Sequence, residues 1–310
     1  MNNLVSNNQT ELFGLNIFMN EFIQLYKNNK LPNKILISGN KGIGKATMAY
    51  HFINYVLSED EEFKYDAQNF KIDPKNRTFK TIINGSNPNL ILIDVNSEKK
   101  FIDINQIRQL ISNLNKSSFN TKPKFVLIDN IEYLNINSVN ALLKILEEPP
   151  ENVIFFLINN NKKILPTLLS RCINFRIYLS YKESLNILDK LLNSQLNELL
   201  SQDLINHYST PGNILNLISF GIKNNYDLSK VDLKSFVKMI IKDNQYKKDN
   251  LVKLLLFNLI EFYFNKINMS LSSNINEKYN YFLKKIVEIK KFNLDEESLI
   301  IEFEDKILNG

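Results

Sequence analysis

Five short apolar runs divide the first part of the chain into a regular alternation. They are Ile35–Ile37, Leu90–Ile93, Phe125–Ile128, Val153–Ile158 and Ile173–Leu179. Between the runs, apolar residues recur at helical spacing, as at Met48, Phe52, Ile53 and Val56 and again at Val139, Leu142, Leu143 and Leu146. Uninterrupted apolar strands suit a sheet that is covered on both faces. Strands that alternate with helices predict a parallel α/β sheet.

The strand pattern stops after Tyr178, and helical patterns follow. Residues 183–222 predict short helices with a turn at Pro211-Gly212, and the long amphipathic segments 250–267 and 279–291 predict a helical bundle. We therefore expect an α/β domain over 1–178, a small helical domain over 179–222 and an all-α domain over 223–310. Residues 58–87 are polar and poorly periodic, so we expect a surface insertion without chemistry there.

Composition narrows the class of protein. The 310 residues include one cysteine, Cys172, which excludes an internal disulfide and favours a reducing, cytoplasmic location. The amino terminus lacks the basic segment and apolar core of a signal peptide, and no uncharged apolar run approaches the roughly 20 residues of a membrane span. A net charge of +5 permits contact with nucleic acid without requiring it.

Arginine is rare in this chain. Of 38 basic residues, the arginines are Arg77, Arg108, Arg171 and Arg176. Against a background so rich in lysine, we expect an arginine to stand where lysine cannot replace it, because guanidinium alone offers a rigid fork of donors.

A glycine-rich segment follows the first predicted strand. Gly39-Asn40-Lys41-Gly42-Ile43-Gly44-Lys45-Ala46-Thr47 lies between a strand and a helix, which is the setting of a phosphate-binding P-loop. Gly39, Gly42 and Gly44 would let the backbone N–H groups surround phosphates, and Lys45 would reach the outer ones. The alternative is a glycine-rich turn without a ligand.

The residues that hydrolysis needs are altered. Ala46 replaces the hydroxyl residue that binds magnesium in a P-loop, and Thr47 is one residue late, about 100° further around the helix. Asp129 ends an apolar strand, where a carboxylate holds magnesium or its water, although it also fits a simple strand terminator. Asn130 follows it and cannot act as a base, and Glu132 is the alternative base. We predict little or no intrinsic ATPase activity, weak ATP or ADP binding at most, and no metal ligands.

Two motifs suggest a family. Ser170-Arg171-Cys172, together with Asn140-Ala141-Leu142-Leu143-Lys144-Ile145-Leu146-Glu147-Glu148-Pro149-Pro150, closely resembles the clamp-loader branch of the AAA+ ATPases. Within that branch the chain is similar to the delta-prime family of the bacterial DNA polymerase III holoenzyme. The similarity extends from Leu12-Phe13-Gly14 through Ile104-Asn105-Gln106-Ile107-Arg108 to Phe292-Asn293-Leu294-Asp295, and the alanine in the P-loop favours delta-prime over the ATPase subunit.

The resemblance implies a fold and a role. It implies a five-stranded AAA+ core, a three-helix lid and a helical collar that assembles a pentamer. It also implies that Arg171 is an arginine finger in the nucleotide site of a neighbouring subunit; an ordinary capping or ion-pairing arginine is the alternative. The implied partners are the gamma/tau and delta subunits, the sliding clamp and primed DNA. Asn213 follows Thr210-Pro211-Gly212 where the family places a nucleotide-sensing arginine, and the absence of cysteine from 58–87 predicts no zinc.

Two other functions stay open at this point. One is an ATP-hydrolysing motor subunit of the same loader, with Thr47 or a water in place of the missing hydroxyl. The other is a P-loop nucleotide kinase, which would need a basic acceptor-binding lid and would leave the carboxyl-terminal helices unexplained. Lys116 and Lys144 are candidate DNA contacts, although lysines on solvated helix faces are common.

Overall fold

The computed structural model describes residues 5–95, 101–114, 121–206, 209–248, 250–268, 273–292 and 296–309. The chain forms two compact units. The first comprises Met1–Ile187 with Thr210–Asn213, and the second comprises Leu188–Ser209 with Ile214–Gly310. The predicted division of the helical part into two domains at residue 222 stays a prediction.

The first unit is built on one parallel sheet. Its strands run in the order β2-β3-β4-β1-β5, and every neighbouring pair is parallel. The predicted parallel α/β sheet and its five strands are confirmed, except that the last strand ends at Arg176 instead of Leu179. The strands are β1 (Lys34–Ser38), β2 (Leu90–Ile93), β3 (Lys124–Ile128), β4 (Val153–Asn159) and β5 (Ile173–Arg176).

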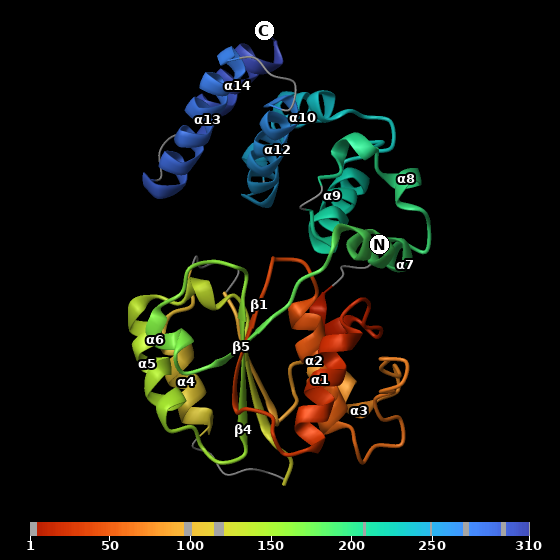
Figure 1. The fold of residues 1–310 in the computed structure, drawn as a ribbon, viewed down its shortest axis with the longest axis vertical. Helices are drawn as coiled ribbons and strands as arrows, with labels where there is room; N and C mark the ends of the chain where they lie inside the picture. Colours follow the sequence, from red (N-terminus) through yellow and green to blue (C-terminus); the bar gives the residue numbers. More distant parts are fainter. Residues whose placement is uncertain are drawn as a thin grey trace. The chain divides into compact units, whose positions relative to one another are not determined.

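Helices cover both faces of this sheet (Figure 1). Because side chains alternate along a strand, Ile35 and Ile37 of β1 join the core on one face and Leu36 joins the core on the other. Each core is apolar, which explains why the strands are nearly continuous apolar runs. One face carries α1 (Asn16–Lys27), α2 (Lys45–Leu57) and α3 (Arg77–Ile83), and the other carries α4 (Ile104–Leu114), α5 (Ile136–Glu147) and α6 (Pro166–Leu169).

The segment 58–87 contributes to the core, so the expectation of a surface insertion is wrong for its apolar residues. Buried side chains from its turns and from α3 pack into the same cluster as α2; they are Tyr65, Phe70, Ile72, Phe79 and Ile82. Asn76 caps α3 by accepting from the Phe79 backbone N–H at 2.6 Å, and it accepts from Asn54 of α2 at 3.0 Å. Periodicity missed this segment because most of it is irregular.

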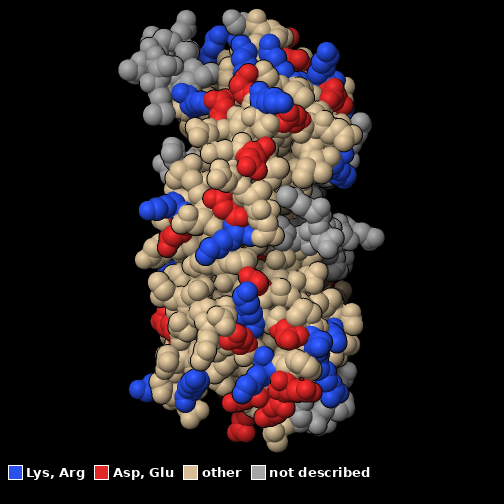
Figure 2. All heavy atoms as spheres, turned by 90° about the vertical axis from the view of Figure 1, so that its right-hand side faces the viewer, with Lys and Arg blue, Asp and Glu red and all other residues tan. Residues whose placement is uncertain are grey.

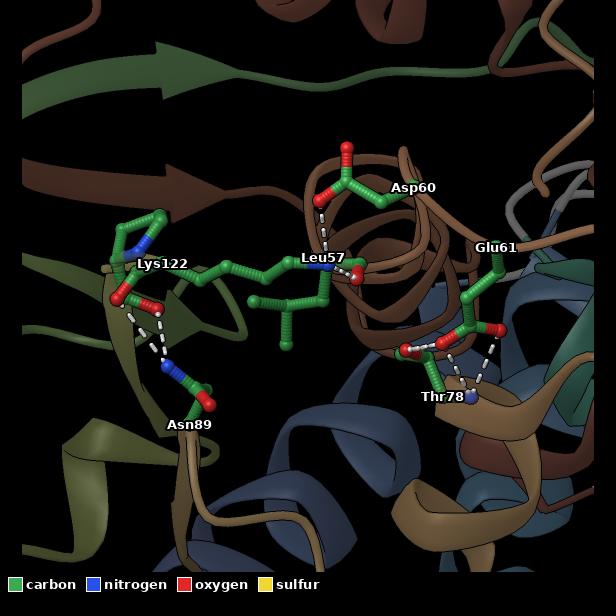
Figure 3. A network of polar contacts seen from close by, with 7 residues as sticks. Leu57, Asp60, Glu61, Thr78, Asn89 and Lys122 are labelled. Carbon is green, nitrogen blue, oxygen red and sulfur yellow. Dashed lines mark hydrogen bonds and ion pairs between the residues drawn. The ribbon is translucent and has the colours of Figure 1, made fainter. Parts of the chain in front are cut away.

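Further polar contacts attach this segment and the start of β3 (Figure 3). The Glu61 carboxylate accepts from the Thr78 backbone N–H at 3.1 Å and from its hydroxyl at 2.5 Å, at the positive end of α3. The Lys122 ammonium donates to the carbonyl of Leu57 at the end of α2, 2.8 Å away. The Asn89 amide donates to the carbonyl of Lys122 at 3.2 Å. These contacts fix the loops at the end of the sheet opposite the P-loop.

The second unit is helical. The predicted amphipathic segments are confirmed as α12 and α13, and the rings of Phe264, Phe282 and Phe303 meet in its core with centroids 5.5–5.6 Å apart. The helices after the sheet are α7 (Tyr181–Leu192), which begins in the first unit, α8 (Leu196–Leu199), α9 (Pro211–Lys223), α10 (Leu233–Lys242), α11 (Gln245–Lys248), α12 (Asn250–Asn268), α13 (Ser273–Phe292) and α14 (Glu296–Phe303).

Charge is spread over the visible surface. Figure 2 shows basic and acidic side chains interspersed on the face that it presents, which in the first unit is the side of α1 and α3. The positive net charge therefore does not gather into one basic patch on this face. Among the described residues, no helix combines the length and the apolar composition that crossing a membrane requires.

Candidate functional site

The glycine-rich segment forms a tight loop between β1 and α2. Gly42 and Gly44 have φ angles of 86° and 93°, a region that side chains other than glycine rarely adopt, and Gly44 is the N-cap of α2. The loop therefore brings backbone N–H groups and the positive end of a helix together. This geometry fits an anionic phosphate group.

Lys45 is buried at the start of α2, with 3% of its surface exposed. Its ammonium donates to the carbonyl oxygens of Gly39 at 2.9 Å and Asn40 at 2.7 Å, and to the side-chain oxygen of Asn160 at 2.9 Å. Burial lowers the pKa of Lys45 to about 8, while the charge of Asp129 acts in the opposite direction. The lysine is thus satisfied by oxygens of the protein.

Asn160, directly after β4, connects the loop to the ends of the sheet. Its amide nitrogen donates to the side-chain oxygen of Asn130 at 2.8 Å and to Glu132 at 2.9 Å. Asn130 has a φ angle of 57° and donates to the Asp94 carboxylate at 2.8 Å. The sequence analysis missed Asn160 and Asp94 as site residues. Each follows an apolar strand, as Asp129 does, and that position was the available signal.

Asp129 lies at the end of β3, as the sequence predicts. Burial and, second, the charge of Asp94 raise the pKa of the Asp129 carboxyl to about 6. One carboxylate oxygen accepts from the backbone N–H of Asn130 at 2.8 Å. The pair of carboxylates makes this edge of the sheet negative, which would suit a cation.

The first turn of α2 contains Ala46 and Thr47, and both are partly buried. Ala46 occupies the position from which a P-loop hydroxyl binds magnesium, and its methyl group offers no ligand. The loop therefore fits phosphates better than it fits the metal that hydrolysis uses. Weak binding of ATP or ADP stays a prediction.

A short segment from the start of α9 packs directly on the P-loop. The Gly212 backbone N–H donates to the carbonyl of Gly42 at 2.8 Å, and the Thr210 hydroxyl donates to the carbonyl of Lys41 at 2.7 Å. A methyl group on Gly212 would lie 2.7 Å from the Gly42 Cα. Two glycines are needed because the two backbones touch. Asn213 is exposed beside them.

Arg171 lies in the turn between α6 and β5. One terminal nitrogen donates to the carbonyl of Thr167 at 2.9 Å, and the other donates to the Glu147 carboxylate at 2.5 Å. Both partners belong to the α5–α6 layer, on the opposite face of the sheet from α2. The side chain is 32% exposed. Its recorded contacts are therefore separate from those of Lys45.

The remaining candidate residues have no recorded side-chain hydrogen bond or ion pair with the P-loop or with Arg171 in the described part of the chain. Cys172 is partly buried against the α5 side of the core, and Lys144 is exposed on α5. His51 is fully buried and contacts the Tyr65 hydroxyl at 3.0 Å, so it packs within the fold. Lys116, His207 and the segment 293–295 lie outside the described residues. Within the described part of the chain, no group of three or more His, Cys, Asp or Glu side chains could hold a metal ion.

Comparisons with known proteins give the family. A family model described as "DNA polymerase III, delta subunit" matches residues 14–179, which is more than half of the chain. The DNA polymerase III subunit delta' of Buchnera aphidicola subsp. Schizaphis graminum is 28% identical over 283 residues, covering 86% of this chain and 82% of that protein.

Two further relatives match shorter stretches. The delta' subunit of Buchnera aphidicola subsp. Baizongia pistaciae is 32% identical over 50% of this chain and 47% of that protein. The tau/gamma subunit of Haemophilus influenzae is 36% identical over 49% of this chain, which spans 21% of that protein. The family model and the delta' relatives agree with the resemblance carried by Arg171 and the P-loop. The chain belongs to the DNA polymerase III delta-prime family of clamp-loader subunits.

Proposed function

We propose that this clamp-loader subunit has little or no ATPase activity of its own and supplies Arg171 to the nucleotide site of a neighbouring subunit. The observation that carries the proposal is the separation of two sets of contacts. Lys45 is enclosed by Gly39, Asn40 and Asn160, whereas the partly exposed Arg171 is bonded to α5 and α6, the helices on the other face of the sheet. The N–H donors of Arg171 that these two bonds do not use are therefore available to bind a second protein or its ligand.

The chemistry of the chain's own site supports the first half of the proposal. Hydrolysis needs a hydroxyl ligand for magnesium, and Ala46 stands at that position. It also needs a carboxylate that activates water, and Asn130 follows Asp129 instead. The Asn130 amide is engaged by Asp94 and Asn160, which leaves it a structural role. A P-loop of this shape fits a bound nucleotide that is not turned over.

The properties of guanidinium support the second half. Negative charge spread over the oxygens of a transferred phosphoryl group is stabilised by a bidentate donor, and arginine fingers accelerate such reactions by about a thousandfold or more. Arg171 is one of four arginines in a chain with 38 basic residues. This use explains why lysine does not occupy the position.

Membership of the family supports a proposal for the partners. We infer a hetero-oligomer with gamma/tau and delta subunits that loads the sliding clamp onto primed DNA. Residues 179–222 would be its helical lid and 223–310 its collar, which would supply the assembly contacts. The exposed apolar side chains of Leu165, Leu169 and Ile173 beside Arg171 suit a surface that is covered in the assembly.

A motor subunit is the second candidate. The positive φ angles of Gly42 and Gly44 and the buried Lys45 favour it, because they keep the geometry of a phosphate site. This candidate requires Thr47 or a water to take the place of the missing hydroxyl. Steady ATP turnover by the purified chain without partners would favour it over the stator.

The proposal is tested by single-turnover ATP hydrolysis in reconstituted loaders that carry wild-type Arg171, Arg171→Ala or Arg171→Lys. Saturating ATP separates altered chemistry from altered affinity. We expect both variants to assemble and both to lose clamp- and DNA-stimulated hydrolysis at the adjoining subunit, with little rescue by lysine. Equal rates in all three complexes would leave Arg171 a structural residue.

A further inference from the structure

The guanidinium of Arg171 is held at both of its ends. One terminal nitrogen donates to the backbone carbonyl of Thr167, and the other donates to the carboxylate of Glu147. An arginine has five N–H donors in one plane. Two bonds from different terminal nitrogens therefore fix the orientation of that plane and leave three donors for another ligand.

The two contacts differ in kind. Thr167 contributes a backbone oxygen of α6, which also accepts from the Ser170 hydroxyl at 3.1 Å, and the Arg171 backbone N–H donates to Leu168 within the same turn. This contact is local and depends on the path of the chain. Glu147 contributes a side chain from α5, 24 residues away in sequence. It is the contact that a single substitution can remove without altering the turn.

The backbone of Glu147 is itself well fixed. It is the last residue of α5 and follows Leu146, which is fully buried. Leu168 of α6 is buried in the same apolar cluster, so the helices that carry the two partners of Arg171 pack on one core. The spacing between the backbones that carry Glu147 and Arg171 is therefore set by packing.

The ion pair is poorly suited to stabilising the fold. The Arg171 and Glu147 side chains are 32% and 54% exposed, and ion pairs with such exposure contribute little to folding because water screens them and two long side chains must be ordered. Ordering a long, flexible arginine before it meets its ligand is a different effect, because the entropic cost of that ordering no longer falls on binding. The exposed ion pair is therefore better suited to ordering Arg171 before binding than to stabilising the fold.

We infer that Glu147 is a positioning residue for Arg171, orienting its guanidinium before it meets the phosphates in a neighbour's site. The inference rests on the proposed function of Arg171. Glu147 touches no substrate; it acts through the arginine, accepting a hydrogen bond and leaving the proton on the guanidinium. Glu148, next in the chain, is exposed and has no recorded ion pair in the described part of the structure, so it is a matched control.

The first test measures ATP hydrolysis in reconstituted loaders carrying Glu147→Ala, Glu147→Gln or Glu148→Ala. We expect Glu147→Ala to lower kcat about tenfold with an unchanged KM for ATP, because the free arginine must be ordered during the reaction. Glu147→Gln retains an acceptor oxygen and should keep most of the activity, as should Glu148→Ala. Faster hydrolysis in both Glu147 variants, or no change in Glu147→Ala, would overturn the inference.

A second readout does not depend on hydrolysis. With four arginines in the full chain, the side-chain nitrogen NMR signals of Arg171 can be assigned by comparison with Arg171→Lys. We expect distinct, slowly exchanging terminal nitrogens for Arg171 in the wild type and in Glu147→Gln, and one averaged signal in Glu147→Ala. An averaged signal in the wild type would overturn the positioning role.

The two readouts separate this inference from the proposed function. In an Arg171→Ala background, Glu147→Ala should have no further effect on hydrolysis; an additional loss there would show that Glu147 acts by another route and would overturn the inference. If Arg171→Ala alone left hydrolysis unchanged while the NMR signals showed an ordered guanidinium, the proposed function would fail. The contact between Glu147 and Arg171 would then still be shown to order the side chain.

Discussion

Lys45 and Arg171 are two cations of the same α/β unit, and they are held in contrasting ways. Lys45 is 3% exposed and bonds to three oxygens around the P-loop. Arg171 is 32% exposed and bonds to two oxygens, which leaves three of its N–H donors for another ligand. One cation is bonded within the P-loop region, and the other is the one that we propose to act on a ligand outside the subunit.

The contrast extends to the neighbouring residues. Near Lys45, the amide of Asn130 stands where a base is expected, and it is hydrogen-bonded to Asp94 and Asn160. Close to Arg171 in sequence, the side chains of Leu165, Leu169 and Ile173 are apolar and exposed. The contrast is the one expected under the proposed function, in which the subunit's own site is inactive and Arg171 serves the site of a neighbour. Three substitutions in the P-loop region test this contrast through their effects on the free energy of unfolding.

The largest effect is expected for Asn160→Ala. The change removes an acceptor from the buried Lys45 ammonium and a donor from Asn130 and Glu132, so the free energy of unfolding should fall by ~3 kcal/mol. Urea denaturation measures it. Asn161→Gly is the control, because glycine keeps the φ of 56° and removes one exposed bond to Asn40. An equal loss in both variants would mean that the hydrogen bonds around Lys45 contribute no more to stability than one exposed hydrogen bond does.

A smaller effect is expected for Gly212→Ala. The added methyl group would lie 2.7 Å from the Gly42 Cα and 3.0 Å from its carbonyl oxygen, so the two backbones must separate, at a cost of ~2 kcal/mol. Alanine is otherwise favoured over glycine in a helix such as α9, so without the close contact Gly212→Ala would raise the stability instead of lowering it. Thermal unfolding should show a lower Tm for Gly212→Ala and almost no change for Asn213→Ala. A raised Tm for Gly212→Ala would exclude the close contact.

The smallest effect is expected for Asp129→Asn, and its sign is positive. Because the folded-state pKa of Asp129 is raised from 3.8 to about 6, the folded wild type binds this proton more tightly than the unfolded chain does. Stability from this group is full below pH 3.8 and is lost as pH rises through 6. The two pKa values correspond to ~3 kcal/mol at pH 7. We expect the variant to recover ~1 kcal/mol of it, because its amide oxygen accepts more weakly than a carboxylate from the Asn130 backbone N–H, and we expect this gain to vanish near pH 4. A gain that is independent of pH would contradict the role of charge.

The fold was largely predictable, because its signal is local. Uninterrupted runs such as Phe125–Ile128 gave the strands, and helical spacing gave α2, α5, α12 and α13. The packing of α3 was not predictable in this way. Its buried Phe79 and Ile82 lie in a helix of seven residues, too short to show a period, and its cap depends on Asn54 from another helix.

The site was predictable in its residues and not in its contacts. The P-loop, Asp129 and Arg171 could be identified from motifs. The bond between Lys45 and Asn160 joins residues 115 positions apart, and the bond between Asn130 and Asp94 spans 36. Such pairs form only when parallel strands bring their carboxyl ends to the same edge of a sheet. The partner of Arg171 was hidden for the same reason, since Glu147 belongs to a preceding helix.

The most direct test of the account compares Lys45→Ala with Arg171→Ala in reconstituted loaders whose assembly is verified by size exclusion. Two rates are measured at saturating ATP, clamp loading onto primed DNA and ATP hydrolysis at the adjoining subunit. We predict a rate within about twofold of wild type for Lys45→Ala, because the subunit's own site does not drive loading, and a loss approaching a thousandfold in hydrolysis at the adjoining subunit for Arg171→Ala. Abolished loading in Lys45→Ala, together with normal hydrolysis in Arg171→Ala, would contradict the account.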